Sequence, residues 1–352
     1  MSTLAHFYYT PAILNYNFGP NHPLRPERLR RTIELLGRYG VRPMDPGPCH
    51  TDDIRRVHDD DYIEDVRTGG TAEFGFGRGD NPAFPDMWEA SLAYVAATVK
   101  AAEAVRDGAP LAFGIGGGLH HANRRKASGF CVFDDPAIAC HILLERFDRV
   151  AYVDIDVHHG DGVQWIFYEE PRVLTCSIHE EGRSLFPGTG FVEETGLGHT
   201  SLNVPLQAYT TGDVWLDAFE RGILPGLETF QPGAIVLQMG TDTHRDDPLG
   251  HIKSDTQSWL AAVRHVKALG LPIVAVGGGG YNMTTVPRMW TAACLTLGGI
   301  EFDDQVPKDL ADQWGMPTYF DPEQDASGIG REYADGVLNW LSRNLHPVVG
   351  KD

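Results

Sequence analysis

The stretch Tyr152-Val-Asp-Ile-Asp-Val-His-His-Gly-Asp-Gly162 carries the strongest signal in this sequence. It places three carboxylates and two imidazoles within eight residues, directly after the apolar run Val150-Ala-Tyr-Val153. A strand alternates its side chains with a period of two, so Asp154, Asp156 and His158 point the same way if the extended backbone continues. Carboxylates and imidazoles together are ligands for a cation such as zinc. Because so much charge at a strand end repels itself without a cation, a metal site is favoured over a polar loop with a helix cap.

Composition excludes several classes of protein. The net charge of the 352-residue chain is −19, and no basic patch could neutralise phosphates, so nucleic acid is not an expected partner. The five cysteines are scattered and form no CxxC pair, which favours a reducing compartment over a disulfide framework. The sequence has neither a secretory leader nor an apolar run of membrane-spanning length. We therefore expect a soluble, cytoplasmic protein with no membrane partner.

Apolar strand patterns alternate with helical patterns along the chain. Buried strands are predicted at 111–115, 150–155, 173–177, 234–238 and 273–276. Helices are predicted at 27–39, 87–106, 136–145, 214–230, 256–268, 286–297 and 332–343. Strands that are apolar throughout and separated by helices predict a parallel sheet covered on both faces. No repeat or linker divides the chain, so we expect one domain over residues 1–352. Residues 301–352 should complete this domain at its C-terminal end, and the segment 301–324 is expected to be acidic and irregular.

Four of the predicted strands run directly into residues that can do chemistry. In an open parallel sheet, sites form beyond the carboxyl ends of the strands. The residues that follow these strand ends are, in chain order, His120 and His121, Asp156 and His158, Asp242, and Tyr281. The glycine runs before His120 and Tyr281 match neither a Walker loop nor G-x-G-x-x-G. We expect them to let the backbone turn tightly, so that the side chain that follows each run points into the site. The alternative is a simple tight turn with no role in a site.

The residue types at these strand ends suggest hydrolysis of an amide. Asp156, His158 and Asp242 form a three-ligand set with room for water, which is typical of a catalytic rather than a structural zinc. Zinc would lower the pKa of that water to about 7 and polarise a substrate carbonyl. The two adjacent histidines could supply a general base and a general acid, and the tyrosine could donate to the developing oxyanion. No Ser-His-Asp order or G-x-S-x-G elbow competes with this reading.

Seven motifs, in order along the chain, resemble the zinc-dependent histone deacetylase family. They are His22-Pro-Leu-Arg-Pro-Glu-Arg28, Gly116-Gly-Gly-Leu-His-His-Ala122, Ser128-Gly-Phe-Cys-Val-Phe-Asp134, Asp154-Ile-Asp-Val-His-His-Gly-Asp161, Phe186-Pro-Gly-Thr-Gly190, Gly240-Thr-Asp-Thr243 and Gly277-Gly-Gly-Gly-Tyr-Asn282. The match runs from about residue 6 to residue 297 and is strongest to the bacterial acetoin-utilisation deacetylases, near the class I enzymes. The resemblance implies an arginase/deacetylase-like open three-layer α/β/α sandwich with a central, mainly parallel sheet of eight strands.

The resemblance also implies a role for individual residues. Zinc would be bound by Asp156, His158 and Asp242. The acid–base pair would be His120 and His121, with Asp154 and Asp161 as their carboxylate partners and Tyr281 as the residue that polarises the carbonyl. The substrate would contact Asp80 at the rim, Gly129, Phe130, Phe186, Leu249 and Gly279 along a tunnel, and Arg28 in a cavity beneath the metal. A structural potassium ion would be held by Asp154, Asp156, His158, Ser177 and Ile178.

Three kinds of function are compatible with these motifs. The first is hydrolysis of acetyl-lysine side chains in proteins or peptides, and the second is hydrolysis of acetylpolyamines by the same fold. The third is binding of acyl-lysine without catalysis, which loss of Tyr281 or of a histidine–carboxylate pair would favour, and none of these is lost. An arginase-like dinuclear manganese site would need further bridging aspartates.

The expected substrate depends on the residue at the tunnel entrance. The polyamine-specific relatives carry a glutamate at the position of Leu249, so Leu249 favours the apolar stem of acetyl-lysine. The pair Glu180-Glu181, expected at the rim, and the net charge of −19 would instead attract a polycation. Exposed charges act weakly beyond about 8 Å at physiological salt, so the specific residue carries more weight. The oligomeric state and the use of iron in place of zinc stay open.

Overall fold

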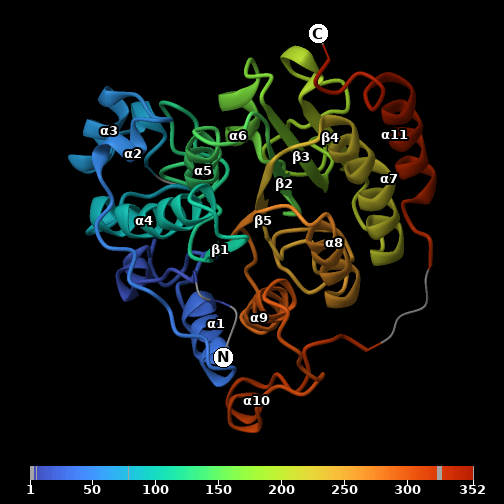
Figure 1. Cartoon of the computed structure of the whole chain (residues 1–352). Coiled ribbons are helices and arrows are strands. Elements are labelled where there is room, and N and C mark those ends of the chain that lie inside the picture. Colours follow the sequence, from blue (N-terminus) through green and yellow to red (C-terminus); the bar gives the residue numbers. More distant parts are fainter. Residues whose placement is uncertain (1–3, 5, 78, 323–326, 352) are drawn as a thin grey trace.

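The computed structural model describes residues 4, 6–77, 79–322 and 327–351 (Figure 1). At its centre these residues form one sheet of six parallel strands, with the order β1-β6-β5-β2-β3-β4. The strands are β1 (Leu111–Gly114), β2 (Val150–Asp154), β3 (Val173–Glu180), β4 (Ser201–Leu206), β5 (Ala234–Gln238) and β6 (Ile273–Val276). Every residue of β2, β3, β5 and β6 is buried, because helices cover the sheet on both sides.

Two groups of helices enclose the sheet, which lies between them in Figure 1. On one side α4 (Met87–Arg106) packs on β1 and β6, α5 (Asp135–Leu143) packs on β2 and β5, and α6 (Asp161–Phe167) lies beside α5. On the other side α7 (Gly212–Phe230) packs on β3 and β4 and is followed by α8 (Thr256–Ala268) and α9 (Thr285–Leu297). The remaining helices are α1 (Glu27–Arg38), α2 (Thr51–Ile54), α3 (Asp60–Arg67), α10 (Lys308–Trp314), α11 (Arg331–Asn344) and the short 3-10 turns η1 (Pro11–Asn15), η2 (Ala72–Phe74) and η3 (Leu197–His199).

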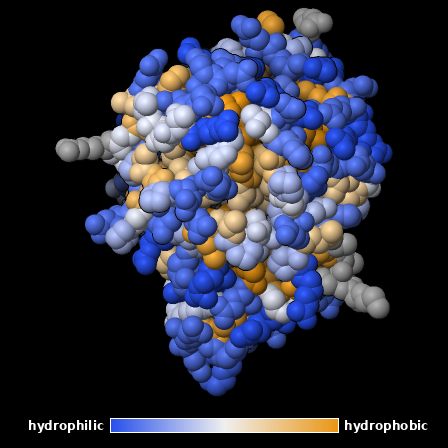
Figure 2. Space-filling model, turned by 90° about the vertical axis from the view of Figure 1, so that its left-hand side faces the viewer, coloured by the Kyte–Doolittle hydropathy of each residue, from blue (hydrophilic) through white to orange (hydrophobic). Residues whose placement is uncertain are grey.

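The surface in Figure 2 has hydrophilic residues around hydrophobic ones that gather near the middle of that face. The packed apolar side chains lie beneath, in a core that includes the largest aromatic residues, such as Trp215, Trp259 and Trp290. Within the described part of the chain, no helix combines the length and the apolar character that crossing a membrane requires.

The α/β class with a parallel sheet is confirmed, whereas the count of eight strands is wrong for the described residues. Beyond β1 the described residues extend the sheet only by single parallel bridges, in which Phe7 pairs with Phe113 of β1 and Tyr8 pairs with Met44. Prolines end these pairings, because proline has no N–H to donate: Pro11 starts η1 after the first segment, and Pro43 precedes Met44 in the second.

Two further expectations for individual elements need correction. Strand β4 was not predicted, because Ser201, Asn203 and Pro205 interrupt its apolar run. An edge strand such as β4 tolerates these residues. The segment 301–324, expected to be irregular, contains α10, which Lys308 and Asp312 support with an ion pair of 2.9 Å one turn apart. Residues 323 and 324 lie outside the described residues.

The boundary between β2 and β5 is the topological switch point of the sheet. From β2 the chain proceeds outward to β3 and β4, and it then returns to β5 on the opposite side and continues to β6. Asp154, at the end of β2, lies opposite Gln238, at the end of β5, in the parallel register. Residues that follow these two strands therefore meet in the crevice at the carboxyl edge of the sheet.

Candidate active site

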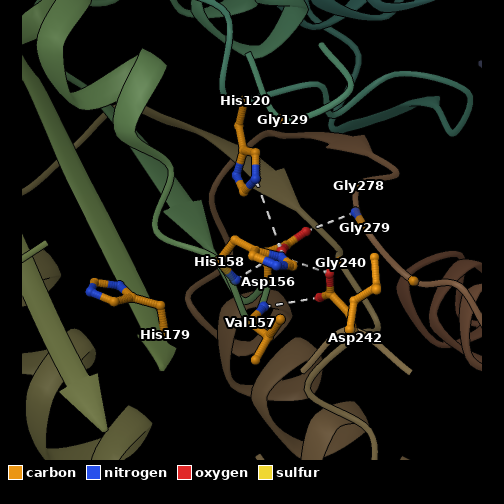
Figure 3. A network of polar contacts seen from close by, with 12 residues as sticks. His120, Gly129, Asp156, Val157, His158, His179, Gly240, Asp242, Gly278 and Gly279 are labelled. Carbon is orange, nitrogen blue, oxygen red and sulfur yellow. Dashed lines mark hydrogen bonds and ion pairs between the residues drawn. The ribbon is translucent and has the colours of Figure 1, made fainter. Parts of the chain in front are cut away.

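Three side chains that follow β2 and β5 point toward one another (Figure 3). His158 Nδ1 lies 3.2 Å from Asp156 Oδ1 and 3.1 Å from Asp242 Oδ2, and all three side chains are buried. One possible ligand atom from each residue lies within 4.8 Å of the others. Main-chain groups orient the carboxylates, since Val157 N donates to Asp242 Oδ1 at 2.9 Å and Gly279 N donates to Asp156 Oδ2 at 2.7 Å. The strand-end pattern therefore brings the expected metal ligands together.

The charges of this cluster fit a divalent cation. Burial and the neighbouring charge of Asp156 raise the pKa of Asp242 to about 7. Burial lowers the pKa of His158, but hydrogen bonds to the two aspartates outweigh it and raise this pKa to about 10. The carboxylates thus stabilise a positive charge at a point that is shielded from solvent. A metal ion at this point would meet two carboxylates and one imidazole nitrogen, a donor set that suits zinc and leaves room for further ligands.

The two adjacent histidines each face a carboxylate of their own. His120 Nδ1 lies 2.7 Å from Asp154 Oδ2, and His121 Nδ1 lies 2.6 Å from Asp161 Oδ1. Because both Nδ1 atoms are engaged in this way, the two Nε2 atoms are directed toward each other, 3.0 Å apart. All four side chains are buried. The carboxylates thus fix the orientation of both rings, and the Nε2 atoms remain available for proton transfer.

Adjacent as they are, the two imidazoles have opposite pKa shifts. Burial lowers the pKa of His120, but the carboxylates of Asp154 and Asp156 outweigh burial and raise it to about 9. Burial lowers the pKa of His121 well below its ordinary value, and the positive charges of His120 and His158 lower it further. One ring is therefore a proton donor and the other a proton acceptor. Neighbouring groups whose environments separate their pKa values in this way are suited to acid–base chemistry.

The glycine run after β6 brings Tyr281 to the same place. Gly278 and Gly280 have φ values of +144° and +124°, in a region that favours glycine. Arg28 Nη1 donates to the carbonyl oxygens of both glycines at 2.8 Å, which fixes the loop from beneath. Burial, followed by the nearby carboxylates, raises the pKa of Tyr281 well above its ordinary value. Its hydroxyl therefore stays protonated and can donate a hydrogen bond.

A cleft of about 210 Å³ leads from the surface to these groups. The ring of Phe130 lies 5.8 Å from that of Tyr281, and the ring of Phe186 lies 5.0 Å from that of His121. Apolar walls above a polar floor suit an extended aliphatic chain with a polar group at its end. The residues that line this cleft are Asp80, His121, Gly129, Phe130, His158, Leu185, Phe186, Leu249 and Tyr281.

The wall of the cleft at residues 129 and 130 has an unusual backbone. Both residues are left-handed, with φ of +50° at Gly129 and +68° at Phe130. A Cβ at position 129 would lie 2.3 Å from His121 Cδ2, so only glycine lets the wall approach this ring so closely. The carbonyl oxygen of Phe130 accepts a hydrogen bond from the Tyr16 hydroxyl at 2.8 Å, which helps to hold the strained turn. Non-glycine residues in this region often belong to functional sites.

Two smaller cavities lie behind the cleft. The first is small and is lined by residues that include Leu119, His120 and Gly279. The second is also small and is lined by Arg28, Leu119 and Trp290 among others. Arg28 is buried there, with its guanidinium 5.1 Å from the Trp290 ring. Gly279 and Arg28 therefore lie at the floor of the site rather than along the cleft wall.

The residues expected to hold potassium lie on β2, on β3 and in the loop after β2. Asp154 lies opposite Ser177 in the register of these strands, and Ile178 follows on β3. Asp154 Oδ1 accepts a hydrogen bond from Asp156 N at 3.0 Å, and Ser177 Oγ lies 2.8 Å from His179 Nδ1. All are buried, and the potassium assignment stays a prediction.

Two polar residues of the site are missing from the sequence-based assignment. Gln238 Nε2 donates to Asp156 Oδ2 at 2.8 Å, and the Tyr152 hydroxyl donates to Asp154 Oδ2 at 2.6 Å. A signal was available for both, because they are polar members of otherwise apolar strands. Tyr152 shares the alternating face of Asp154, and Gln238 ends the neighbouring strand.

The acidic rim expected from Glu180 and Glu181 is wrong. Strand β3 extends to Glu180, whose side chain is 1% exposed and accepts hydrogen bonds from His251 N and Nδ1, both at 2.9 Å. The carboxylate of Glu181 accepts from the Tyr333 hydroxyl at 2.8 Å and lies 3.4 Å from Arg183 Nη1. Both carboxylates are thus engaged within the protein.

Comparison with known proteins agrees with this geometry. A family model described as the histone deacetylase domain matches residues 22–297. The chain is 37% identical over 333 residues to the acetoin utilization protein AcuC of Bacillus subtilis (strain 168), covering 88% of this chain and 86% of that protein. It is 37% identical over 364 residues to histone deacetylase clr6 of Schizosaccharomyces pombe, covering 96% and 88% of the two chains.

A solved structure supports the same relationship. The crystal structure of an HDAC homolog complexed with SAHA has a TM-score of 0.86 and 28% identity to this chain, covering 95% of this chain and 98% of that one. The chain belongs to the histone deacetylase family, as its motifs indicate.

Proposed function

We propose that this protein is a zinc-dependent lysine deacetylase that hydrolyses acetyl-lysine side chains of proteins or peptides. The observation that carries this proposal is the meeting of a metal-ligand set, two histidine–carboxylate pairs and a tyrosine hydroxyl at the floor of one apolar cleft. Membership of the histone deacetylase family supports deacetylation as the reaction. The aliphatic stem of acetyl-lysine suits walls made by Phe130, Phe186 and Leu249.

Asp156, His158 and Asp242 would hold the zinc ion, which would polarise the amide carbonyl and lower the pKa of a water molecule to about 7 when bound. The protein's own groups move the protons. His121 Nε2, at the wall of the cleft, takes the proton of the attacking water while Asp161 holds Nδ1.

The histidine pair then returns one proton to the lysine nitrogen as the C–N bond breaks, so the pair ends in its starting state. The products are acetate and the lysine ammonium group, which takes up the second proton of the attacking water. Tyr281 donates a hydrogen bond to the carbonyl oxygen, where negative charge develops. Asp80, which also lines the cleft, would hold the substrate backbone.

Acetyl-lysine is favoured over acetylpolyamine by the entrance of the cleft. Leu249 lines the cleft, and an apolar residue offers no partner for a second ammonium group. The carboxylates of Glu180 and Glu181, which a polycation would need at the rim, are engaged elsewhere. The net charge of −19 favours the alternative substrate, but it acts diffusely.

The test is kcat/KM for an acetyl-lysine peptide against acetylspermidine at ~0.15 M ionic strength. We expect a preference for the peptide, and Leu249→Glu should shift the ratio toward the polyamine. Leu185→Glu is the matched control, because it adds the same charge to another wall of the same cleft. A tenfold or greater preference of the parent for the polyamine would contradict the proposed substrate, and binding without turnover of either would contradict the enzyme.

We further propose a structural potassium ion at Asp154, Asp156, His158, Ser177 and Ile178, and a cytoplasmic location. The close placement of Asp154 and Ser177 supports the first, and five free cysteines support the second. Metal analysis after dialysis against potassium-free buffer checks the ion, with iron measured in the same sample. Loss of thermal stability that potassium restores, but sodium does not, is the expected result.

A further inference from the structure

Asp247 connects two walls of the cleft. Its side chain is buried, with 6% exposed. Asp247 Oδ2 accepts a hydrogen bond from Tyr281 N at 2.7 Å, and Asp247 Oδ1 accepts one from Leu249 N at 3.0 Å. Tyr281 comes from the loop after β6 and Leu249 from the loop after β5, and both line the cleft. One carboxylate thus holds the main chain of both segments.

The loop before Tyr281 has little preference of its own for one conformation. It consists of the glycine run 277–280, in which two residues have positive φ. Arg28 fixes two of its carbonyl oxygens, and Asp156 accepts from the N–H of Gly279. Asp247 alone, among the described residues, accepts from the N–H of Tyr281 itself. Asp247 therefore holds the main chain at the residue that ends the glycine run.

Asp247 is itself held in place by its loop. Asp247 N donates to His244 O at 2.9 Å, and Pro248 restricts the backbone that follows. The ring of His244 is completely buried, and its Nε2 lies 3.0 Å from Asp321 Oδ2. The packed loop thus holds the carboxylate of Asp247 in one position, from which it accepts the hydrogen bond of Tyr281 N.

We propose that Asp247 is a positioning residue that sets the place of the Tyr281 hydroxyl at the floor of the cleft. This inference rests on the proposed deacetylase function. Asp247 acts through Tyr281 and does not contact the reacting atoms. Displacement of a reacting group by about 1 Å can cost about 10²-fold in rate, so one hydrogen bond to the main chain is enough to control turnover.

The alternative is that Asp247 only closes a local turn. Its bond to Leu249 N, two residues on, is an Asx turn that many loops contain. Asp247→Asn separates the two roles. The amide keeps the volume and can keep the turn through its oxygen, but its NH2 group then faces the N–H of Tyr281, where two donors cannot bond.

We expect Asp247→Asn to lower kcat by about 10- to 100-fold on an acetyl-lysine peptide, with KM changed less than about twofold. Zinc content and Tm should stay close to the parent's. In the Tyr281→Phe background the same substitution should cost almost nothing further, because both changes remove the same contribution. Asp246→Asn is the matched control. The Asp246 carboxylate, next to Asp247 in the sequence, is exposed, and its loss should leave kcat unchanged.

Hydrogen exchange keeps the inference testable if no substrate is turned over. Asp247→Asn should speed exchange of the Tyr281 amide, measured on a peptide that spans 278–284, and Asp246→Asn should not. Failure of the parent to hydrolyse any acetylated substrate would contradict the proposed function alone. A parent-like kcat in Asp247→Asn, a full additional loss in the Tyr281→Phe background, or unchanged exchange at Tyr281 would overturn the role of Asp247.

Discussion

Two clusters of histidine and aspartate lie near the carboxyl end of β5, and both place possible ligand atoms within 4.8 Å of one another. The first consists of Asp156, His158 and Asp242, and the second of His244, Asp246 and Asp321. In the second cluster Arg288 Nη2 donates to Asp321 Oδ1 at 2.6 Å, and Arg245 Nη2 lies 3.6 Å from the same oxygen. Asp156 and Asp242 form no ion pair with any lysine or arginine of the described residues.

The difference teaches that ligand residues alone do not identify a metal site. In the second cluster two guanidinium groups already balance the carboxylate of Asp321, and they would repel an added cation. In the first cluster, among the described residues, imidazoles are the only ion-pair partners within 4.0 Å of the two carboxylates, so the negative charge is available to a metal ion. The source of positive charge therefore distinguishes a proposed metal centre from an ion-pair network.

Asp242→Ala tests the first cluster and should have the largest effect. Removing one of three ligands should remove most of the bound metal and essentially all hydrolysis of an acetyl-lysine peptide. Metal analysis and turnover of the same sample measure both. A variant that keeps full zinc and normal turnover would show that the ligand assignment is wrong.

Tyr281→Phe should leave the metal and the fold intact but lower kcat by about 10²–10³-fold, because the phenol hydroxyl stabilises charge that develops on the carbonyl oxygen. The effect should fall on kcat rather than KM, since the hydroxyl is needed most in the transition state. Steady-state kinetics with zinc analysis checks this. Equal kcat in the variant and the parent would remove Tyr281 from the mechanism.

Asp321→Ala probes the second cluster, where we expect a loss of stability and no loss of metal. The change leaves the buried guanidinium of Arg288 without its carboxylate, which typically costs about 3–5 kcal/mol. Urea unfolding gives the free energy, and metal analysis gives the stoichiometry. Loss of zinc at unchanged stability would instead make the second cluster a metal site.

Asp134 offers a third case, a buried carboxyl that belongs to neither cluster and forms no ion pair with the described residues. Its Oδ1 accepts from Ala137 N at 2.8 Å, whereas Oδ2 has no hydrogen-bond partner among the described residues. Burial raises its pKa well above the ordinary value of 3.8. Above about pH 4 the folded state therefore keeps a proton that the unfolded state releases. The contribution of the Asp134 carboxyl to stability is fully present below about pH 4, and it is lost as the pH rises toward the pKa of the folded state.

Asp134→Asn should remove this pH dependence and keep the bond to Ala137 N. We expect the variant to be more stable than the parent by about 1–3 kcal/mol at pH 7.5, with a smaller difference at pH 4.5. Thermal unfolding at both pH values measures it. An equal difference at the two pH values would argue against a protonated Asp134.

The position of the first cluster could be predicted from the sequence because parallel strands end at one edge. Asp156 and Asp242 follow apolar runs, and adjacent strands in the sheet bring them together. The histidine–carboxylate pairs came from the family resemblance, since spacing alone does not say which carboxylate faces which ring. The close contacts of His120 and His121 depend on the loop after β1 meeting the loop after β2.

The surroundings of these groups could not be predicted in the same way. Glu180 looks exposed in the sequence, but β3 extends farther than its apolar run and carries this side chain into the interior. Asp321 comes from a segment with no strand or helix pattern, and its pairing with Arg288 depends on tertiary packing. Burial and counter-charge arise from contacts between distant segments, so a local pattern does not report them.

Titration of metal-free protein with zinc, followed by bound metal and by hydrolysis of an acetyl-lysine peptide, tests the proposed centre most directly. We predict saturation at one zinc per chain, with the rate rising in proportion to occupancy of that site. The same stoichiometry should hold in Asp321→Ala. Full activity without metal, or a rate that rises only with a second equivalent, would contradict a single catalytic zinc at Asp156, His158 and Asp242.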